Sequence, residues 1–229
     1  VMGGTLIVKR IKGVKRPSLT PVMPGLNNMY ILLDGGANVD CRPDMLRQFA
    51  VMGSVYMNKI MGVDNPKVGL LNVGAEEEKG NALVKETFPL LKEQTDINFT
   101  GSIEARNIPY GDADVIVSEA FAGNIILKLY EGLGAVLVSK IKDGMMTSTR
   151  SKLGALLVKP ALKETLKAFD ATEYGGAPLL GLRGLVVKTH GSAKAKEVCN
   201  SIIQCITFKE QKINDKIMEC IQTESRSDE

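Results

Sequence analysis

The sequence is poor in the side chains that most often carry metal or covalent chemistry. It contains a single histidine, His190, and four cysteines, which are Cys41, Cys199, Cys205 and Cys220. The cysteines form no C-x-x-C pair and no metal-type spacing with His190, so we expect no metal site and reduced thiols in a cytosolic protein. With one histidine there is no convincing Ser-His-Asp order, and no cysteine has a visible base. Covalent catalysis is therefore disfavoured.

Long apolar runs and a large net charge are also missing. No apolar run reaches the length of a membrane span, so we expect any membrane contact to be peripheral. The net charge of +3 is too small to indicate nucleic acid as a partner, and basic residues interleaved with stacking aromatics are absent. No G-x-G-x-x-G follows a strand-like run and no aspartate cluster suits a metal, which disfavours a nucleotide-dependent dehydrogenase and indicates no cofactor.

The sequence has enough apolar residues for one sizeable core. Of its 229 residues, 44% are hydrophobic and 24% are charged, which is ordinary for a globular protein. We expect residues 1–224 to form one domain and residues 225–229 to form a disordered tail. Residues 1–8 read like the inside of a helix or strand, whereas domain boundaries are usually polar. We therefore expect the chain to lack the N-terminal part of its fold.

Strand-like and helix-like segments alternate along the chain. Short apolar runs predict strands at residues 29–33, 67–73, 97–100, 115–118 and 185–188. Helical patterns cover residues 44–61, 82–93, 125–141, 150–169 and 192–221, with Pro89 and Pro160 interrupting two of them. Residues 174–178 read as a tight loop. This alternation predicts a three-layer α/β/α fold with a mostly parallel sheet covered on both faces.

Three loops that follow predicted strands share small residues, one or two polar side chains and a helix start. They are residues 34–40, 74–81 and 119–124. Free N–H groups at helix starts attract anions, and glycines let the backbone approach a ligand closely. The three loops would form a phosphate or carboxylate pocket if they met in one crevice. Taken singly, each loop has a plainer interpretation: an ordinary turn, a helix cap, or, for Lys79, a solvated surface charge.

Two other features leave alternatives open. His190 either bonds a loop carbonyl as a structural residue or lines the pocket. The segment from residue 151 to 169 combines four lysines with five leucines. Such a basic amphipathic segment can lie on an anionic membrane surface, meet an acidic protein partner, or pack in the core or a dimer with a solvated basic face.

Taken together, the motifs resemble the bacterial phosphate:acyl-carrier-protein acyltransferase family (PlsX). The matching runs include LLDGGANVDCRPDMLRQFAVMGSVY, NPKVGLLNVGAEEEKGN, GDADVIVSEAFAGNIILKLYEG and EYGGAPLLGLRGLVVKTHGSAKAK, in family order. The resemblance implies transfer of a long-chain acyl group from acyl carrier protein to inorganic phosphate. The acyl-phosphate would then supply a downstream glycerol-3-phosphate acyltransferase in phospholipid synthesis. It also implies a fold like that of isocitrate and isopropylmalate dehydrogenases and phosphate acetyltransferases, in a cytoplasmic homodimer attached peripherally to the membrane.

The resemblance also suggests residue roles. The family's catalytic lysine and asparagine fall on Lys79 and Asn124, and its membrane-contacting helix falls on residues 151–160, with Leu153 and Leu157 as insertion residues. From the three loops and the segment around the histidine we expect the substrate-binding residues. They are Asp34, Asn38, Asn81, Gly123 and His190.

The sequence departs from the family pattern in two places. A SAGNTGA-type loop of the active-site region would lie just upstream of residue 1. In addition, Gly35 replaces a common β-branched residue, which should loosen the strand end. Two other functions stay open: a phosphate acyltransferase that uses short acyl-CoA, and a non-catalytic remnant that binds membrane or carrier protein.

Overall fold

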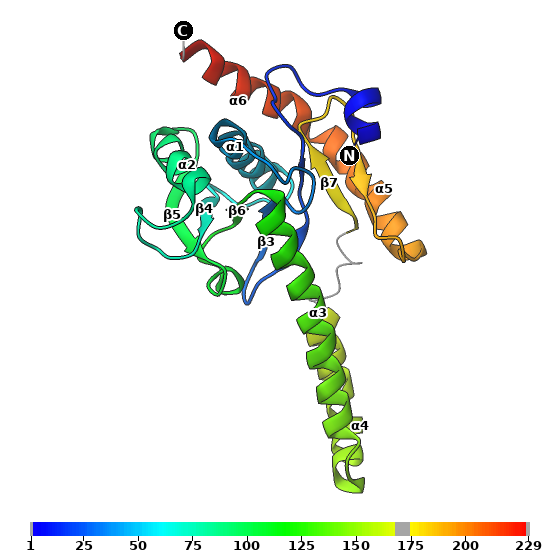
Figure 1. The fold of residues 1–229 in the computed structure, drawn as a ribbon. Coiled ribbons are helices and arrows are strands. Elements are labelled where there is room, and N and C mark those ends of the chain that lie inside the picture. Colours follow the sequence, from blue (N-terminus) through cyan, green and yellow to red (C-terminus); the bar gives the residue numbers. More distant parts are fainter. Residues whose placement is uncertain (1, 168–174, 228–229) are drawn as a thin grey trace.

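We describe the fold from a computed structural model, which covers residues 2–167 and 175–227. The elements are η1 (Gly4–Val8), β1 (Ser18–Leu19), β2 (Val22–Pro24), β3 (Met29–Leu33), α1 (Pro43–Lys59), β4 (Lys67–Asn72), α2 (Ala82–Glu93), β5 (Asn98–Glu104), η2 (Ile108–Tyr110), β6 (Val115–Val117), α3 (Ala120–Met145), α4 (Thr149–Lys167), β7 (Ala177–Leu180), β8 (Val187–Lys188), α5 (Ala195–Glu210) and α6 (Ile213–Ser227). Figure 1 shows their arrangement.

The main sheet has five strands in the order β2-β3-β6-β4-β5. Strands β3, β6, β4 and β5 are parallel, and β2 is antiparallel to β3. A second, antiparallel sheet has the order β1-β7-β8. The central strands β3 and β6 are buried almost throughout, because helices cover both faces of the sheet.

Three clusters of buried side chains make the core: one on each face of the main sheet and a smaller one at the second sheet, formed by Leu19, Leu179 and Leu182. On one face, Phe49 of α1, Leu91 of α2 and Ile217 of α6 pack against the strands. On the other face, Leu32 and Ile116 of the strands pack against the first turns of α3. The predicted three-layer α/β/α fold with a mostly parallel sheet is therefore confirmed.

Helices α3 and α4 form a long hairpin that projects away from the sheet (Figure 1). The predicted helix at residues 125–141 is too short at both ends, because Glu119 caps the helix and the helix continues through Gly144 to Met145. Helix α4 likewise runs straight through Pro160, where the sequence predicts an interruption. Its predicted end at residue 169 lies outside the described residues.

By length and composition, α3 is the one helix of the described residues that could cross a membrane. This differs from the expectation that no apolar run reaches the length of a membrane span, since α3 extends beyond the predicted residues 125–141. The start of α3 belongs to the folded body: Ala120 and Gly123 are buried, and the Tyr130 hydroxyl donates to the Pro24 carbonyl oxygen at 2.6 Å. The remaining residues, 131–145, form about 22 Å of helix, which is less than the hydrocarbon thickness of about 30 Å.

The predicted amphipathic segment at residues 192–221 is two helices, α5 and α6, which separate at Lys212 with φ 50°. The apolar residues of α6, Ile213, Ile217 and Ile221, are buried against α1. In α5, Ile202 and Ile206 remain more than half exposed, whereas Phe208 is buried. The apolar periodicity is continuous across the break, but α5 packs on the body mainly through Phe208, whose ring centroid lies 5.5 Å from that of Tyr56 in α1. Residues 225–227, predicted as tail, belong to α6.

Candidate active site

The three loops singled out in the sequence leave neighbouring strands of the main sheet. Strand β6 lies between β3 and β4, and all three run parallel. Their carboxyl ends therefore meet at one edge, spaced by about 4.8 Å from strand to strand. Two loops are joined directly, because Asp34 N donates to the Ser118 carbonyl oxygen at 2.8 Å and Ala120 N donates to that of Asn38 at 2.9 Å.

Asp34 is buried and holds the loop after β3 in shape. Its Oδ1 accepts N–H groups from Leu19 at 3.0 Å, Gly36 at 3.1 Å and Ala37 at 2.9 Å. Its Oδ2 accepts the backbone N–H of Asn38 at 2.8 Å and the Asn38 amide at 2.7 Å. Burial raises the pKa of Asp34, against the opposing effect of these hydrogen bonds. The carboxylate is thus engaged inside the protein, and its contact with a substrate stays a prediction.

Two asparagines predicted to bind substrate also make internal hydrogen bonds. The Asn38 amide donates to the Pro17 carbonyl oxygen at 2.7 Å. Asn81 Oδ1 accepts the N–H of Val84 at 2.9 Å and so caps α2. These bonds fix the two loops, and direct contact of either side chain with a ligand stays a prediction.

Gly35, which the sequence analysis expects to loosen the end of β3, lies in a closely packed position. It is buried, and its N–H donates to the Leu19 carbonyl oxygen at 2.8 Å. A Cβ atom at this position would stand 2.6 Å from Pro21 Cδ. Glycine therefore lets the loop approach the segment between β1 and β2 more closely than a β-branched residue could.

Glu119 caps the N-terminus of α3. Its carboxylate accepts the backbone N–H groups of Phe121 at 2.5 Å and Ala122 at 3.0 Å. This helix start is one of the predicted anion sites, and in the structure the carboxylate of Glu119 lies there. A bound anion would have to replace Glu119 or bind beside it.

Gly123 and Asn124 lie in the first turns of α3, against the loop after β3. A Cβ atom on Gly123 would overlap the Asp34 carbonyl oxygen, so only glycine permits this contact. The Asn124 side chain is exposed. Its Oδ1 lies beside Gly36, where a Cβ atom would stand 3.3 Å away. The Asn124 amide is therefore next to the loop backbone and accessible to a ligand.

Lys79 is exposed in the loop after β4. Its Nζ forms an ion pair with Glu76 at 2.8 Å, in which both side chains are about half exposed. The hydrogen bond to Glu76 raises the pKa of Lys79, and the same bond lowers the pKa of Glu76. The Asn72 amide, at the end of β4, fixes the loop by donating to the Lys79 carbonyl oxygen at 3.1 Å. Lys79 is thus a charged ammonium that can exchange Glu76 for another anion.

His190 lies apart from these loops, after β8 of the second sheet. Its Nδ1 is 2.7 Å from Ser192 Oγ, and its backbone N–H donates to Glu197 at 3.1 Å. His190 also lines a groove of about 990 Å³ that runs between α3, the β1–β2 segment and the end of β8. The two interpretations offered by the sequence, loop bonding and pocket lining, are both compatible with this geometry.

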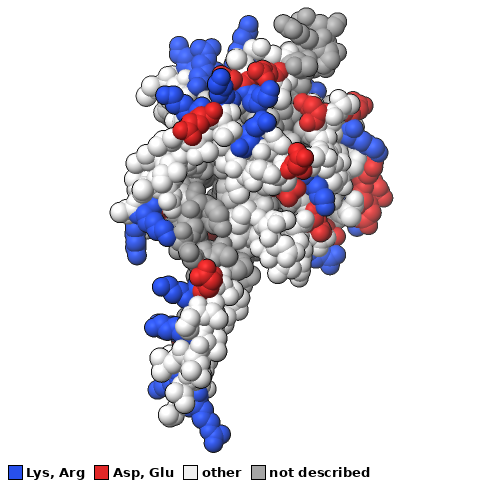
Figure 2. Space-filling view, turned by 180° about the vertical axis from the view of Figure 1, so that it is seen from behind, with Lys and Arg blue, Asp and Glu red and all other residues white. Residues whose placement is uncertain are grey.

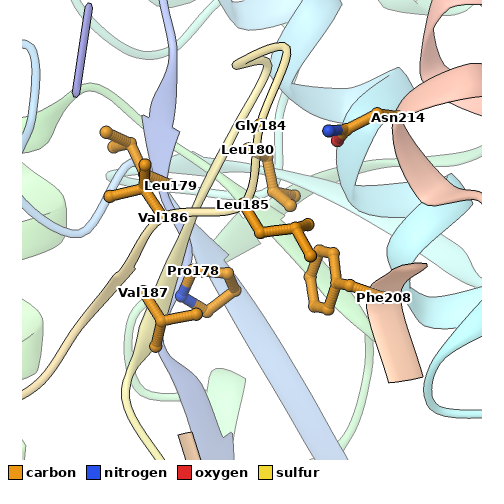
Figure 3. Close-up of a pocket in the computed structure, with 9 residues that line it drawn as sticks. All are labelled: Pro178, Leu179, Leu180, Gly184, Leu185, Val186, Val187, Phe208 and Asn214. Carbon is orange, nitrogen blue, oxygen red and sulfur yellow. The ribbon is translucent and has the colours of Figure 1, made fainter. Parts of the chain in front are cut away.

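A second cavity lies between the β7–β8 segment and the C-terminal helices. Figure 3 shows Pro178, Leu185 and Phe208 around it, with Asn214 at one end. Its volume of about 10 Å³ is room for one water molecule at most. It is a packing gap beneath the second sheet, and the large groove is the better candidate for a ligand.

Sequence reasoning gave no role to three residues that shape the site. Glu76 and Glu119 hold the lysine and the helix start, and Leu19 bonds both Asp34 and Gly35. An acid three residues before a lysine, or directly before a helix, is a local signal that could have identified the two glutamates. The contact of Leu19 depends on tertiary packing. Among the described residues, no group of three His, Cys, Asp or Glu side chains could hold a metal ion.

The chain is similar to proteins of one family over almost its whole length. The family model described as "Fatty acid synthesis protein" matches residues 1–216. A protein of Clostridium acetobutylicum named "Phosphate acyltransferase" is 49% identical over 215 residues, and one of Clostridium perfringens with the same name is 51% identical over 223 residues. These matches cover 94% and 97% of this chain, which spans only 65% and 66% of those relatives.

Two solved structures share the fold. They are the EutD phosphotransacetylase from Staphylococcus aureus, with a TM-score of 0.56 and 19% identity, and a phosphotransacetylase from Streptococcus pyogenes, with a TM-score of 0.55 and 18% identity. Each match covers 96% of this chain and 58% or 59% of the other. The likeness to isocitrate and isopropylmalate dehydrogenases stays a prediction.

Proposed function

Because this chain belongs to the fatty acid synthesis protein family, we propose that it acts as a phosphate acyltransferase, moving a long-chain fatty acyl group from acyl carrier protein to inorganic phosphate. The family resemblance seen in the sequence motifs is confirmed by the match. Since the chain spans about two thirds of its curated relatives, the activity is proposed for the full-length protein.

One observation carries the proposal. Lys79 is exposed on the loop after β4, and Asn124 is exposed in the first turns of α3, which follows the adjacent parallel strand β6. Ligands of open α/β sheets bind at this edge, where loops from neighbouring strands converge. A fixed cation and an amide donor at that edge suit a reaction between an anion and a carbonyl group.

Lys79 would bind the phosphate. Its present partner, Glu76, is exposed, so a phosphate oxygen can take the place of the carboxylate without burying a charge. Exchange of one anion for another keeps the ammonium paired throughout. The pKa of Lys79, raised by its anionic partner, keeps the side chain protonated at neutral pH.

Asn124 would stabilise the transition state. A phosphate oxygen attacks the thioester carbonyl carbon, forming a C–O bond, and the C–S bond then breaks with release of the carrier thiolate. The carbonyl oxygen carries negative charge in between, and the Asn124 amide would donate a hydrogen bond to it. Inorganic phosphate is itself the nucleophile, so the reaction needs no serine or cysteine.

The proposed setting is the cytoplasmic face of a membrane. Leu153 and Leu157 of α4 are 64% and 79% exposed. Figure 2 shows Lys and Arg side chains along one edge and at the tip of the hairpin, beside uncharged surface. This combination suits peripheral contact with anionic lipids. We also propose that the protein is a homodimer, that basic residues dock the acidic carrier protein, and that a glycerol-3-phosphate acyltransferase consumes the product.

The test is acyl-phosphate formation by the full-length protein and by the variants Lys79→Ala and Asn124→Ala. Loss of one oxyanion donor lowers turnover by about 10²–10³-fold, and we expect losses of that order. The matched control is Lys85→Ala, which removes an exposed lysine of α2. Near-wild-type turnover in either variant would remove that residue from the mechanism.

The acyl donor is decided by the same assay. We expect faster turnover with long-chain acyl-acyl carrier protein than with short-chain acyl-CoA. A preference for the coenzyme A thioester would favour the alternative short-chain function. Absence of product from both donors would favour a non-catalytic binding protein.

A further inference from the structure

From the large groove beside α3 we infer a binding site for the acyl chain, running from Asn124 along α3 toward the hairpin. This inference rests on the proposed acyl-transfer function. It adds residues outside the three loops to the substrate-binding site, as the residues that contact the acyl chain. The groove has a volume of about 990 Å³, which lies at the upper end of the usual range for ligand pockets.

The lining of the groove is mainly apolar. Side chains from the β1–β2 segment face side chains from α3 across it; they include Leu19, Val22, Met23, Leu133, Leu137 and Val138. Leu133 and Leu137 are 63% and 58% exposed in this structure. Apolar side chains that line a concave surface and stay in contact with water mark a place where an apolar ligand binds.

The groove begins about one turn along α3 from the candidate catalytic residue Asn124, which does not itself line it. Leu127, Glu131, Ala135 and Val138 follow Asn124 at spacings of three or four residues, so they share its side of the helix. All four line the groove. A carbonyl group held at the Asn124 amide would therefore have its chain directed along this side of α3.

Leu19 provides a second link between the groove and the loops. Its side chain lines the groove. Its backbone is bonded to the loop after β3, because its N–H donates to Asp34 at 3.0 Å and its carbonyl accepts from Gly35 at 2.8 Å. A Cβ atom on Gly36 would stand 3.8 Å from Leu19 Cδ2 and 3.3 Å from Asn124 Oδ1. The apolar lining of the groove is therefore next to the loop after β3.

The length of the groove fits a long chain. Helix α3 lines it from Leu127 to Lys142, a distance of about 22 Å at the rise of an α-helix. An extended chain advances about 1.2 Å per bond, as the polypeptide backbone does, so the 15 C–C bonds of a palmitoyl chain span about 18 Å. The charged and polar lining residues are engaged with one another: Lys128 pairs with Glu131 at 2.7 Å, and the His190 backbone N–H donates to Glu197 at 3.1 Å. The occupant we propose is therefore a fatty acyl chain with its thioester at the Asn124 end.

Two glycines of α3 allow a matched test. Gly134 lines the groove, whereas Gly132 lies on the opposite side of the helix and does not. A Cβ atom at either position meets nothing within 4 Å, so both accept a larger side chain without a clash. Gly134→Leu would fill the groove, and Gly132→Leu adds the same side chain to the same helix outside it.

The first measurement is kcat/KM of the full-length protein with palmitoyl- and butyryl-acyl carrier protein. We expect Gly134→Leu to lower the palmitoyl-to-butyryl ratio by about tenfold or more, and Gly132→Leu to leave it unchanged. The second is equilibrium dialysis with palmitate, for which we expect Gly134→Leu alone to weaken binding. Palmitate binding needs no turnover, so it tests the groove even if neither substrate gives acyl-phosphate and the proposed function fails.

Three results would overturn the inference. One is an unchanged ratio together with unchanged palmitate affinity in Gly134→Leu. Another is an equal effect of the two leucine substitutions. The third is a change of oligomeric state in Gly134→Leu with palmitate affinity intact, which would make the groove an interface between two copies of this chain.

Discussion

Gly123 of α3 lies directly against the carbonyl oxygen of Asp34, and this contact joins two loops of the candidate active site. A Cβ atom on Gly123 would overlap that oxygen and would also stand 2.8 Å from Ser118 Oγ. The loop after β3 and the first turn of α3 can be this close only because residue 123 has no side chain. The position of Asn124, the next residue, follows from the same contact.

We predict that Gly123→Ala destabilises the protein by about 1–3 kcal/mol, as overpacking of a tight contact does. It should also lower turnover, because it pushes Asn124 away from the loop after β3. Urea denaturation measures the stability. In the control, Gly132→Ala, a Cβ atom meets open space, so the higher helix propensity of alanine should give up to about 1 kcal/mol of added stability. Equal stabilities of the two variants would contradict the prediction.

Asp34→Asn should cost on the order of 3 kcal/mol. Both oxygens of Asp34 accept N–H groups. The asparagine side chain has only one oxygen, so in either of its two orientations its NH2 group would face N–H donors. We also expect lower turnover, since the loop that Asp34 holds packs beside Asn124. Urea denaturation and the acyl-phosphate assay provide the measurements.

The control for Asp34→Asn is Asp40→Asn, which makes the same change at an exposed residue of the same loop. A change within about 0.5 kcal/mol is expected there. If Asp34→Asn is as stable as the control, the carboxylate does not hold the loop.

The ion pair of Lys79 and Glu76 predicts a dependence on pH. The hydrogen bond raises the pKa of Lys79 and lowers that of Glu76, so the pair is intact at neutral pH. It weakens as pH falls through the pKa of Glu76 or rises through the pKa of Lys79. In Glu76→Gln the pKa of Lys79 should fall toward its ordinary value. NMR titration of ¹³C-methylated lysines measures this pKa, and the Lys79→Arg variant identifies the Lys79 signal. Identical titration curves for Lys79 in the unmodified protein and in Glu76→Gln would refute the prediction.

Leu153→Glu should weaken binding to anionic vesicles, because it places a charge on the exposed apolar face of α4. Vesicle flotation measures the effect, and binding of the unmodified protein should fall with added salt. The control is Leu26→Glu, a change at an exposed leucine of the body. If Leu153→Glu floats normally, or instead unfolds or changes its oligomeric state, α4 does not contact the membrane in the proposed way.

Local patterns in the sequence were sufficient for much of the fold. Apolar runs and Pro and Gly signals identified β3, α1, β4 and α2 to within two residues, because these elements depend on propensity and periodicity close in the chain. The order of strands and helices also predicted a mostly parallel sheet, in which residues 34–40, 74–81 and 119–124 would form a pocket if they met in one crevice.

Contacts between distant residues were decided only by tertiary structure. Periodicity joined α5 and α6 into one segment, and only packing on α1 distinguishes buried Ile217 from exposed Ile206. The sequence pattern marked Asp34 as a polar loop residue. Its carboxylate oxygens, however, accept backbone N–H groups, one of them from Leu19, which lies 15 residues earlier in the sequence. The groove needs α3 beside both β2 and β8. The sequence itself determined the family, the strand order along the chain and the candidate residues Lys79 and Asn124, whereas burial, pairing and cavities arise only when residues far apart in the chain meet.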